Sequence, residues 1–302
     1  LGKMSKKRWL SNRLEYMGWI LSCAVVRLLS RRAAIRIADC MGWLLWRVGK
    51  VRKQVVLENL HIAFGGVKSE KEIDRIALES IQSCILTFIE FLHPELVGEL
   101  YGDVLQTVDE PENGLALVDK QGLCLLAHIG NWEVQGKIPA HYGVKYRAFA
   151  KPMHNPLVNK AIVEQRRKIG INLIFTNRTN VEVADAIKHK EWIAFLGDQD
   201  ASSRGIFVNF FGKAASTFKG AGFYSWKFGL PILPLFTVRL RDKNRTLKVI
   251  CRPPIYPDTN ADRDTEILRL TQAHTAVLES VIKEYPESYF WLHRRWKSQK
   301  PE

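Results

Sequence analysis

The feature that most constrains the fold is an alternation of short apolar runs with amphipathic stretches, which continues from Gly114 almost to the C-terminus. The apolar runs have the length and composition of buried strands. They cover residues 115–118, 123–127, 146–150, 173–175, 192–196, 232–238 and 247–251. Stretches of helical composition lie between several of them, at 156–169, 180–188, 218–228 and 264–284. This order predicts an α/β fold with a mostly parallel central sheet covered by helices.

The length and composition fit one large domain preceded by further helices. The chain has 302 residues, of which 46% are hydrophobic, so it can bury a substantial core. Apolar residues recur at three- and four-residue spacing over positions 70–93, which predicts a long amphipathic helix. We expect N-terminal helices over 1–53 and an α/β domain over 54–302, with a helical lead-in at 54–110 and the core at 111–302.

The N-terminal segment is basic and rich in tryptophan. Thirteen Lys or Arg and three acidic residues give the first 60 positions a net charge of +10, which leaves +4 of the total +14 for the other 242 residues. The apolar runs 17–26 and 41–46 are shorter than the ~20 residues that a spanning helix needs. We expect one or two helices lying in an anionic membrane surface, with tryptophans at the interface. A basic helix packed on its own domain and a tilted single span are the alternatives.

Charge and cysteine patterns argue against several other functions. The positive charge lies on a Trp-rich apolar segment rather than on a basic face of the domain, which disfavours nucleic-acid binding. The five cysteines are scattered and odd in number, so neither a disulfide framework nor a zinc site can be built from them. This usage fits a reducing compartment. We therefore expect no metal.

The segment 122–133 carries the first candidate site. Its apolar first half predicts a buried strand, His128 lies where that strand should end, and Glu133 follows five residues later. Open α/β sheets place their chemistry at the carboxyl ends of strands. The His-x-x-x-x-Glu spacing alone is weak, because His274 and Glu279 repeat it within a helical stretch, where they should lie ~140° apart. A buried structural histidine is the alternative for His128.

Two further groups of polar residues lie near the ends of predicted elements. Asp198 and Asp200 follow the strand expected at 192–196, and an Asx turn is the alternative interpretation. Ser216 or Thr217 is expected to cap the helix that follows, whose N-terminus could hold a phosphate.

The C-terminal segment forms a third group. Basic and aromatic residues interleave over 289–297, as a phosphorylated amphiphile would require, and a solvated basic tail is the alternative.

These motifs, taken in order, resemble the lysophospholipid acyltransferase superfamily and, within it, the bacterial lipid A biosynthesis acyltransferases of the lauroyl/myristoyl type. Residues 128–133 resemble the superfamily's His-x-x-x-x-Asp/Glu motif, and 198–200 resemble the Asp-Gln-Asp of the lipid A branch. The block 207–220 and the closing signature 286–297 resemble that branch as well. The family's arginine, on the helix after the third core strand, should fall at Arg166 or Arg167.

The resemblance implies an activity and a location. The activity is transfer of a fatty acyl chain, without a cofactor, from an acyl carrier protein or CoA thioester to a hydroxyl of a lipid A precursor. The location is the cytoplasmic face of a bacterial inner membrane. A different glycolipid or lysophospholipid acceptor, or a lipid-binding protein without catalysis, are the alternatives.

The residue types suit this chemistry. His128 would take the proton of the attacking hydroxyl, and Glu133 would fix its tautomer. The oxyanion would be stabilised by backbone N–H groups around Gly130 and Asn131, or by the arginine at 166 or 167. Asp198 is a candidate for orienting that arginine.

The remaining candidates would bind substrate or pack in the core. The tail arginines, Arg294 and Arg295, would bind a sugar-linked phosphate. Cys124 lies four strand residues from His128, roughly 13 Å, so we expect it to pack in the core. We therefore expect direct attack without an acyl-enzyme.

Overall fold

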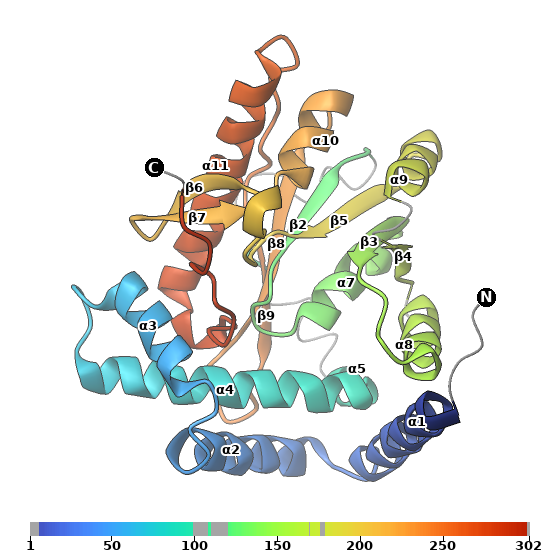
Figure 1. The fold of residues 1–302 in the computed structure, drawn as a ribbon, viewed down its shortest axis with the longest axis vertical. Coiled ribbons are helices and arrows are strands. Elements are labelled where there is room, and N and C mark those ends of the chain that lie inside the picture. The colour runs from blue at the N-terminus through green and yellow to red at the C-terminus, as the bar shows by residue number, and fades with distance from the viewer. Residues whose placement is uncertain (1–5, 99–107, 110–119, 169, 176–178, 301–302) are drawn as a thin grey trace.

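A computed structural model describes residues 6–98, 108–109, 120–168, 170–175 and 179–300 of the chain. The strand expected at 115–118 lies outside these residues. The described part forms a central sheet with helices on both sides and three helices at the N-terminus (Figure 1). The mostly parallel α/β architecture expected from the sequence is therefore confirmed.

The central sheet has seven strands in the order β1-β9-β8-β2-β5-β3-β4. Every pair is parallel except β8 with β9, which are antiparallel neighbours in the chain. The strands are β1 (Val108–Asp109), β2 (Leu123–Leu126), β3 (Tyr146–Ala150), β4 (Asn172–Phe175), β5 (Trp192–Leu196), β8 (Ile232–Arg239) and β9 (Leu247–Cys251).

The middle strand is buried on both faces, which explains its uninterrupted apolar sequence. In β2, Leu123 and Leu125 join one core cluster, whereas Cys124 and Leu126 join the other. Helices α9 (Thr179–Lys188), α10 (Gly220–Phe228) and α11 (Arg263–Glu284) contribute to the first cluster, and α7 (Trp132–His141) contributes to the second. The thiol of Cys124 is a core group, as expected, and burial raises its pKa.

A small hairpin and the two-residue strand β1 were not predicted. Strands β6 (Ile206–Phe210) and β7 (Lys213–Thr217) pair antiparallel and form a separate two-stranded sheet. Its turn residues, Phe211 and Gly212, both have positive φ angles of 53° and 76°. The expected capping role of Ser216 and Thr217 is wrong, because both are buried in β7 and α10 begins at Gly220 without a side-chain cap.

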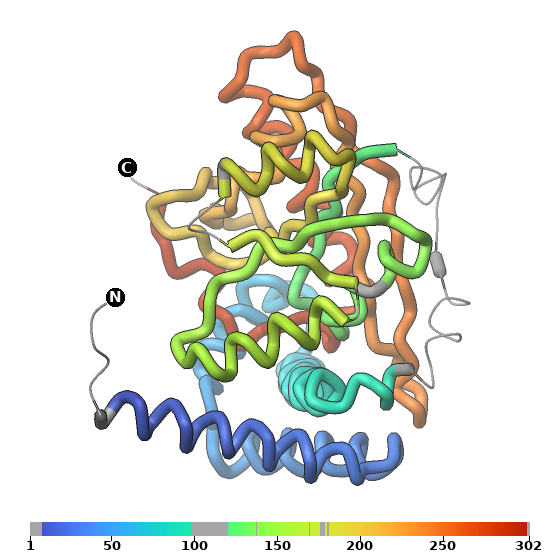
Figure 2. The backbone as a smooth tube through the Cα atoms, turned by 90° about the vertical axis from the view of Figure 1, so that its right-hand side faces the viewer, coloured from blue at the N-terminus to red at the C-terminus, as the bar shows by residue number. Residues whose placement is uncertain are grey.

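The three N-terminal helices are α1 (Lys6–Val26), α2 (Arg31–Arg47) and α3 (Lys53–Phe64). The long helix expected over 70–93 is α4 (Glu70–Leu92), which starts with a capping box formed by Ser69 and Glu72. Helix α1 runs along α8 (Pro156–Lys168), where Asn155 donates to the Asn12 carbonyl (Figure 2). Among the described residues no helix has the length and apolarity to cross a membrane.

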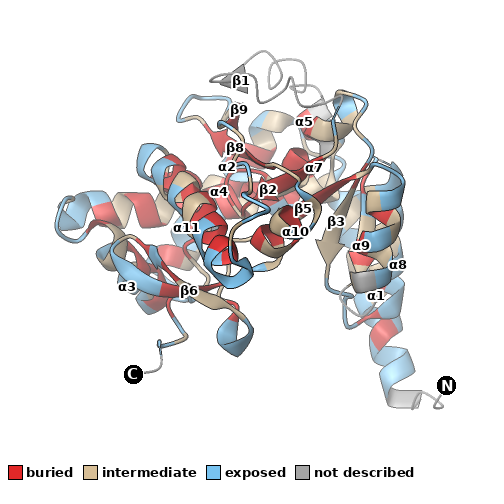
Figure 3. Cartoon of the chain, turned by 90° about the horizontal axis from the view of Figure 1, so that it is seen from above, coloured by how far each residue is buried: buried red, intermediate tan, exposed pale blue. Residues whose placement is uncertain are grey.

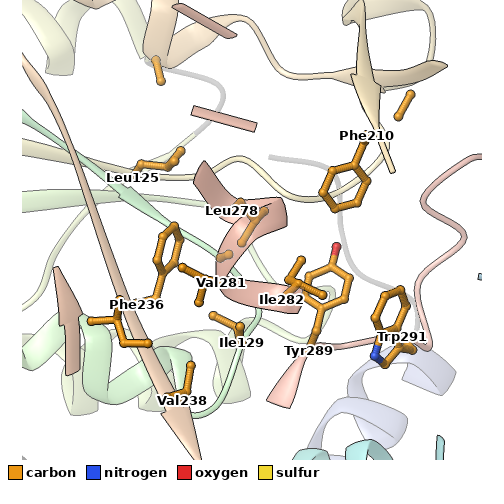
Figure 4. Packing of buried hydrophobic residues seen from close by; sticks show 14 of the residues in the cluster. Leu125, Ile129, Phe210, Phe236, Val238, Leu278, Val281, Ile282, Tyr289 and Trp291 are labelled. Atoms are coloured by element: carbon orange, nitrogen blue, oxygen red, sulfur yellow. The ribbon is translucent and has the colours of Figure 1, made fainter. Parts of the chain in front are cut away.

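The C-terminal segment belongs to the core rather than to the solvent. Tyr289, Trp291 and Trp296 are each at least 94% buried. Tyr289 and Trp291 lie beside Ile282 of α11 and beside Ile129, just beyond β2 (Figure 4). Figure 3 shows how burial varies across the molecule: the central strands are buried, and α1 at the periphery is largely exposed. A solvated tail is therefore not what this segment forms.

Candidate active site

The loop after β2 holds His128 at the carboxyl edge of the sheet. Gly130 has φ +55°, and a Cβ at this position would lie 2.1 Å from the Thr237 carbonyl oxygen of β8. Only glycine combines this backbone conformation with such a close approach. The Phe290 N–H donates to the His128 carbonyl at 3.0 Å, so the C-terminal segment fixes the loop from the other side.

The carboxylate that contacts His128 is Asp198. The His128 Nδ1 and Asp198 Oδ1 atoms are 2.9 Å apart. The register of the parallel pair explains this meeting: Leu126 of β2 lies opposite Leu196 of β5, so the residues two positions beyond each strand come side by side. Asp198 is 98% buried.

The electrostatics of the pair favour a charged imidazole. Burial lowers the pKa of His128, but the charge and the hydrogen bond of Asp198 outweigh it, and the pKa is raised overall. Burial raises the pKa of Asp198, and His128 more than reverses that effect, so it is lowered. Because Nδ1 is engaged, Nε2 is the nitrogen left for chemistry.

Glu133 has a different partner from the one we expected. Arg166 of α8 donates to it twice, from Nε at 3.1 Å and from Nη2 at 2.6 Å. The expectation that Glu133 fixes the His128 tautomer through a hydrogen bond is therefore wrong, as is the expectation that Asp198 orients the arginine. Glu133 lies in the first turn of α7 and faces α8, where a guanidinium satisfies its two oxygens in forked geometry. Its charge still acts on His128, whose pKa it raises as a minor contribution.

The backbone N–H groups proposed for an oxyanion hole are already used. Gly130 N–H donates to the Ser288 carbonyl at 2.8 Å, and Asn131 N–H donates to the Thr237 hydroxyl at 3.2 Å. This corrects the expectation for both residues. The Asn131 side chain instead caps α7 by accepting from the N–H groups of Glu133 and Val134.

A buried charge network holds this cap in place. Glu90 of α4 is 98% buried and accepts from Asn131 Nδ2 at 2.6 Å and from Arg239 Nη2 at 2.7 Å. Arg31, at the start of α2, forms a third contact with the same carboxylate. The network therefore connects an N-terminal helix to the residue that caps α7.

His128 opens into a largely apolar cavity of about 490 Å³. This volume is within the ~300–1,000 Å³ of small-molecule sites. Its polar lining residues include His128, which contacts Gln199, and Glu133, which is paired with Arg166. The other polar residues of the lining are Ser22, Thr87, Lys151 and Asn159. Apolar walls come from α1, α4, α8 and the adjoining strands, with residues such as Trp19, Phe88, Phe91, Ile162 and Leu173.

Three residues around His128 were not singled out from the sequence. The rings of Trp132 and Phe290 lie 5.4 Å and 6.1 Å from the imidazole, centroid to centroid. Gln199 Nε2 is 3.5 Å from His128 Nδ1, and its side chain lines the cavity. Only their positions in the sequence pointed to them. Each lies within a stretch already identified, at 122–133, 198–200 or 289–297, and Trp132 and Gln199 lie directly beside a candidate residue.

The other candidate residues lie outside the cavity wall. The Asp200 carboxylate accepts from Ser202 and Ser298, so it anchors the C-terminal segment. Arg167 is exposed, one position round α8 from Arg166, and of the two arginines it is Arg166 that lines the cavity.

The two tail arginines have different surroundings. Arg295 is 98% buried and donates to the Ser216 carbonyl at 2.6 Å and to the Thr217 hydroxyl at 2.5 Å. The expectation that it binds a phosphate is therefore wrong. Arg294 is exposed. In the part of the chain that the structure describes, no group of three or more His, Cys, Asp or Glu residues has the geometry of a metal site.

Comparison with known proteins identifies a family. The family described as bacterial lipid A biosynthesis acyltransferase matches residues 4–298. A curated relative, the lipid A biosynthesis lauroyltransferase of Escherichia coli (strain K12), is 25% identical over 275 residues, covering 87% of this chain and 85% of that protein. Among solved structures, the 1-acyl-sn-glycerophosphate acyltransferase PlsC of Thermotoga maritima matches with a TM-score of 0.38 and 17% identity, covering 78% of this chain and 96% of that one.

Proposed function

Because the chain belongs to the bacterial lipid A biosynthesis acyltransferase family, we propose that it moves a fatty acyl chain from an acyl carrier protein or CoA thioester to a hydroxyl of a lipid A precursor, with His128 as general base. One observation carries the proposal. The His128 Nδ1 is hydrogen-bonded to the buried Asp198 at 2.9 Å, at the wall of an apolar cavity. This arrangement leaves Nε2 as the acceptor of a proton.

The reaction is a direct displacement at the thioester. The hydroxyl oxygen of the acceptor attacks the thioester carbonyl carbon while its proton passes to His128 Nε2. The resulting imidazolium is stabilised by the Asp198 carboxylate, whose position fixes the tautomer. When the C–S bond breaks, the leaving thiolate takes the proton from the imidazolium, so the products are an ester and a thiol and His128 is again neutral.

Arg166 is our candidate for the group that stabilises the oxyanion. Its Nε and Nη2 are held by Glu133, which leaves Nη1 without a partner among the described residues and with a fixed orientation. Donors that are oriented before the reaction are worth more than donors that must reorganise. Glu133 is then a positioning residue that acts through Arg166.

The apolar walls suit the donor's acyl chain. A cavity lined by aromatic and aliphatic side chains gains free energy from burying methylene groups, about 0.8 kcal/mol for each. Trp19 of α1 forms part of this lining, so the N-terminal helix contributes to the substrate site.

We also propose that α1 and α2 lie on the cytoplasmic face of the inner membrane. Their outer faces expose apolar residues, among them Leu14 (59%), Met17 (65%), Leu21 (66%) and Trp43 (52%). Arginines flank these residues along the same segment. Exposed apolar faces with basic flanks bind anionic bilayers at the headgroup level. The lipid acceptor would then reach His128 from the bilayer.

The test is a single-turnover assay. Purified protein is mixed with radiolabelled acyl carrier protein thioester and a Kdo-bearing tetra-acylated lipid A precursor, beside a His128→Ala variant. We expect a labelled penta-acyl product from the wild type only. Thioester hydrolysis that depends on His128 but gives no product would exclude this acceptor, and ordinary turnover by His128→Ala would overturn the mechanism.

A further inference from the structure

A second large hollow lies on the α3 side of the molecule, and we refer to it as the basic pocket. It has a volume of about 980 Å³ and is bordered by the loop before α3, α3 itself, the tip of the β6–β7 hairpin and the C-terminal segment. Figure 1 shows α3, the hairpin and the C-terminal segment together on one side of the molecule. The basic pocket shares no lining residue with the cavity that holds His128.

Its walls carry an excess of positive charge without counter-ions. The five cations are Lys50, Lys53, Lys213, Arg294 and Lys297, and the one carboxylate among the lining residues is Glu58. None of the five forms an ion pair with a described carboxylate. A nearby cation outside the basic pocket does: Arg47, on the preceding helix, is paired with Asp74 at 2.6 Å. Several like charges around one hollow repel one another, so a bound anion would relieve the repulsion.

The beginning of α3 adds donors to the same wall. The residue before α3, Arg52, has a left-handed φ of 50° and provides no side-chain cap. Gln54 and Val55, in the first turn, line the basic pocket. An uncapped helix N-terminus presents N–H groups and partial positive charge to an anion.

The C-terminal segment contributes a buried donor without a partner to the lining of the basic pocket. Trp296 lines the basic pocket and is 94% buried, and its indole N–H has no hydrogen-bond partner among the described residues.

The surroundings of the basic pocket indicate where the anion comes from. Val48 and Val51, on either side of Lys50, are 64% and 43% exposed, and Trp43 and Leu44, near the end of the preceding α2, are 52% and 50% exposed. A site for a soluble anion would not need an apolar border, whereas a lipid headgroup at a bilayer surface does. We propose that the basic pocket binds the phosphate headgroup of an anionic amphiphile, at a site separate from the acyl-transfer cavity.

The experiment compares two triple variants of the full chain that change the net charge equally. The first is Lys50→Gln/Lys213→Gln/Lys297→Gln in the basic pocket. The control is Lys145→Gln/Lys188→Gln/Lys190→Gln, three exposed lysines near the amino ends of β3 and β5, where the strands begin. Binding is measured by co-sedimentation with vesicles of phosphatidylcholine plus phosphatidic acid, and with vesicles of equal zeta potential whose anion is cholesterol hemisuccinate.

We expect the first variant to bind phosphatidic acid vesicles on the order of a hundredfold more weakly, at ~1 kcal/mol for each lysine, and the control variant to bind like the wild type. The hemisuccinate vesicles should bind the wild type less tightly than the phosphatidic acid vesicles do. Equal losses in both variants, or no preference for phosphatidic acid, would overturn the proposal.

Titration with inorganic phosphate at constant ionic strength separates the two phosphate sources. If inorganic phosphate binds the basic pocket as tightly as the vesicles do, a headgroup site is excluded. If inorganic phosphate displaces the protein from the vesicles only weakly, the headgroup site is supported. The measurement needs no turnover and is repeated with His128→Ala. A failure of the acyl-transfer proposal would therefore leave this result unaffected.

Discussion

His128 is paired with Asp198, and Arg166 is paired with Glu133. This pairing leads to a specific prediction for the substitution Asp198→Asn. The amide is isosteric with the carboxylate and its oxygen can still accept a hydrogen bond from His128 Nδ1, so the orientation of the imidazole should survive. What disappears is the negative charge 2.9 Å from the ring nitrogen. The variant therefore isolates the electrostatic contribution of Asp198 to the imidazolium that forms during attack.

The magnitude follows from the geometry. At an effective dielectric constant of ~20, opposite unit charges about 3 to 4 Å apart attract each other by about 4 to 6 kcal/mol. Asp198 is buried, so the solvent screens little of this. With 1.36 kcal/mol for each factor of ten, kcat should fall by about 10³- to 10⁴-fold. The matched control is Glu133→Gln, which should leave the state of His128 nearly unchanged and act through Arg166 instead.

The assay is a single-turnover pH profile. His128 must be neutral to accept a proton, so activity is lost as the pH falls through its pKa. In the wild type that pKa is raised above the ordinary 6.5 by Asp198, and in Asp198→Asn the acid limb should move to lower pH as the rate falls. An acid limb that stays in place in Asp198→Asn but moves in Glu133→Gln would refute our assignment of the two carboxylates.

Three further predictions concern stability and membrane binding. Glu90→Ala should lower the free energy of unfolding by about 3 to 5 kcal/mol in urea titrations, because it leaves Arg239 and Arg31 buried without their carboxylate; a loss below about 1 kcal/mol would contradict the network. Burial lowers the pKa of His274 to about 4, so the unfolded state binds more protons than the folded state between about pH 4 and 6.5. The free energy of unfolding should therefore fall by about 3 kcal/mol as the pH drops through that window. His274→Gln should flatten this pH dependence, and an unchanged slope would show that other groups cause it. Replacing Leu14 and Leu21 by glutamate should release the protein from anionic vesicles in flotation assays without changing its Tm, because both side chains are mostly exposed, and continued binding would contradict the membrane orientation.

Several strands were predicted from their apolar sequence. The stretches 123–127 and 192–196 match β2 and β5 within one residue, because strands in the middle of a parallel sheet are largely buried and apolar. The stretch 146–150 matches β3 as well, although β3 contains Arg147 and is mostly half-buried. The β6–β7 hairpin was missed because β7 reads Lys-Ala-Ala-Ser-Thr. Its small and polar residues lack strand character, and its Ser and Thr resemble a helix cap.

The pairing of side chains in the site depended on tertiary register. His128 and Glu133 are close in the sequence, but spacing does not reveal that α8 places Arg166 against Glu133. Asp198 lies 70 residues from His128, and only the alignment of β2 with β5 brings their carboxyl ends together. An arginine that is always charged outcompetes an imidazole for a carboxylate it can grip with two hydrogen bonds.

The most direct test of direct acyl transfer is a search for an acyl-enzyme. Wild-type protein is mixed with radiolabelled acyl carrier protein thioester in rapid quench, first without and then with the lipid A precursor. We predict no label on the protein at any time, and product that forms in one exponential phase only when the precursor is present. Label that accumulates on the protein without acceptor and is then chased into product would contradict direct attack by the acceptor hydroxyl on the thioester.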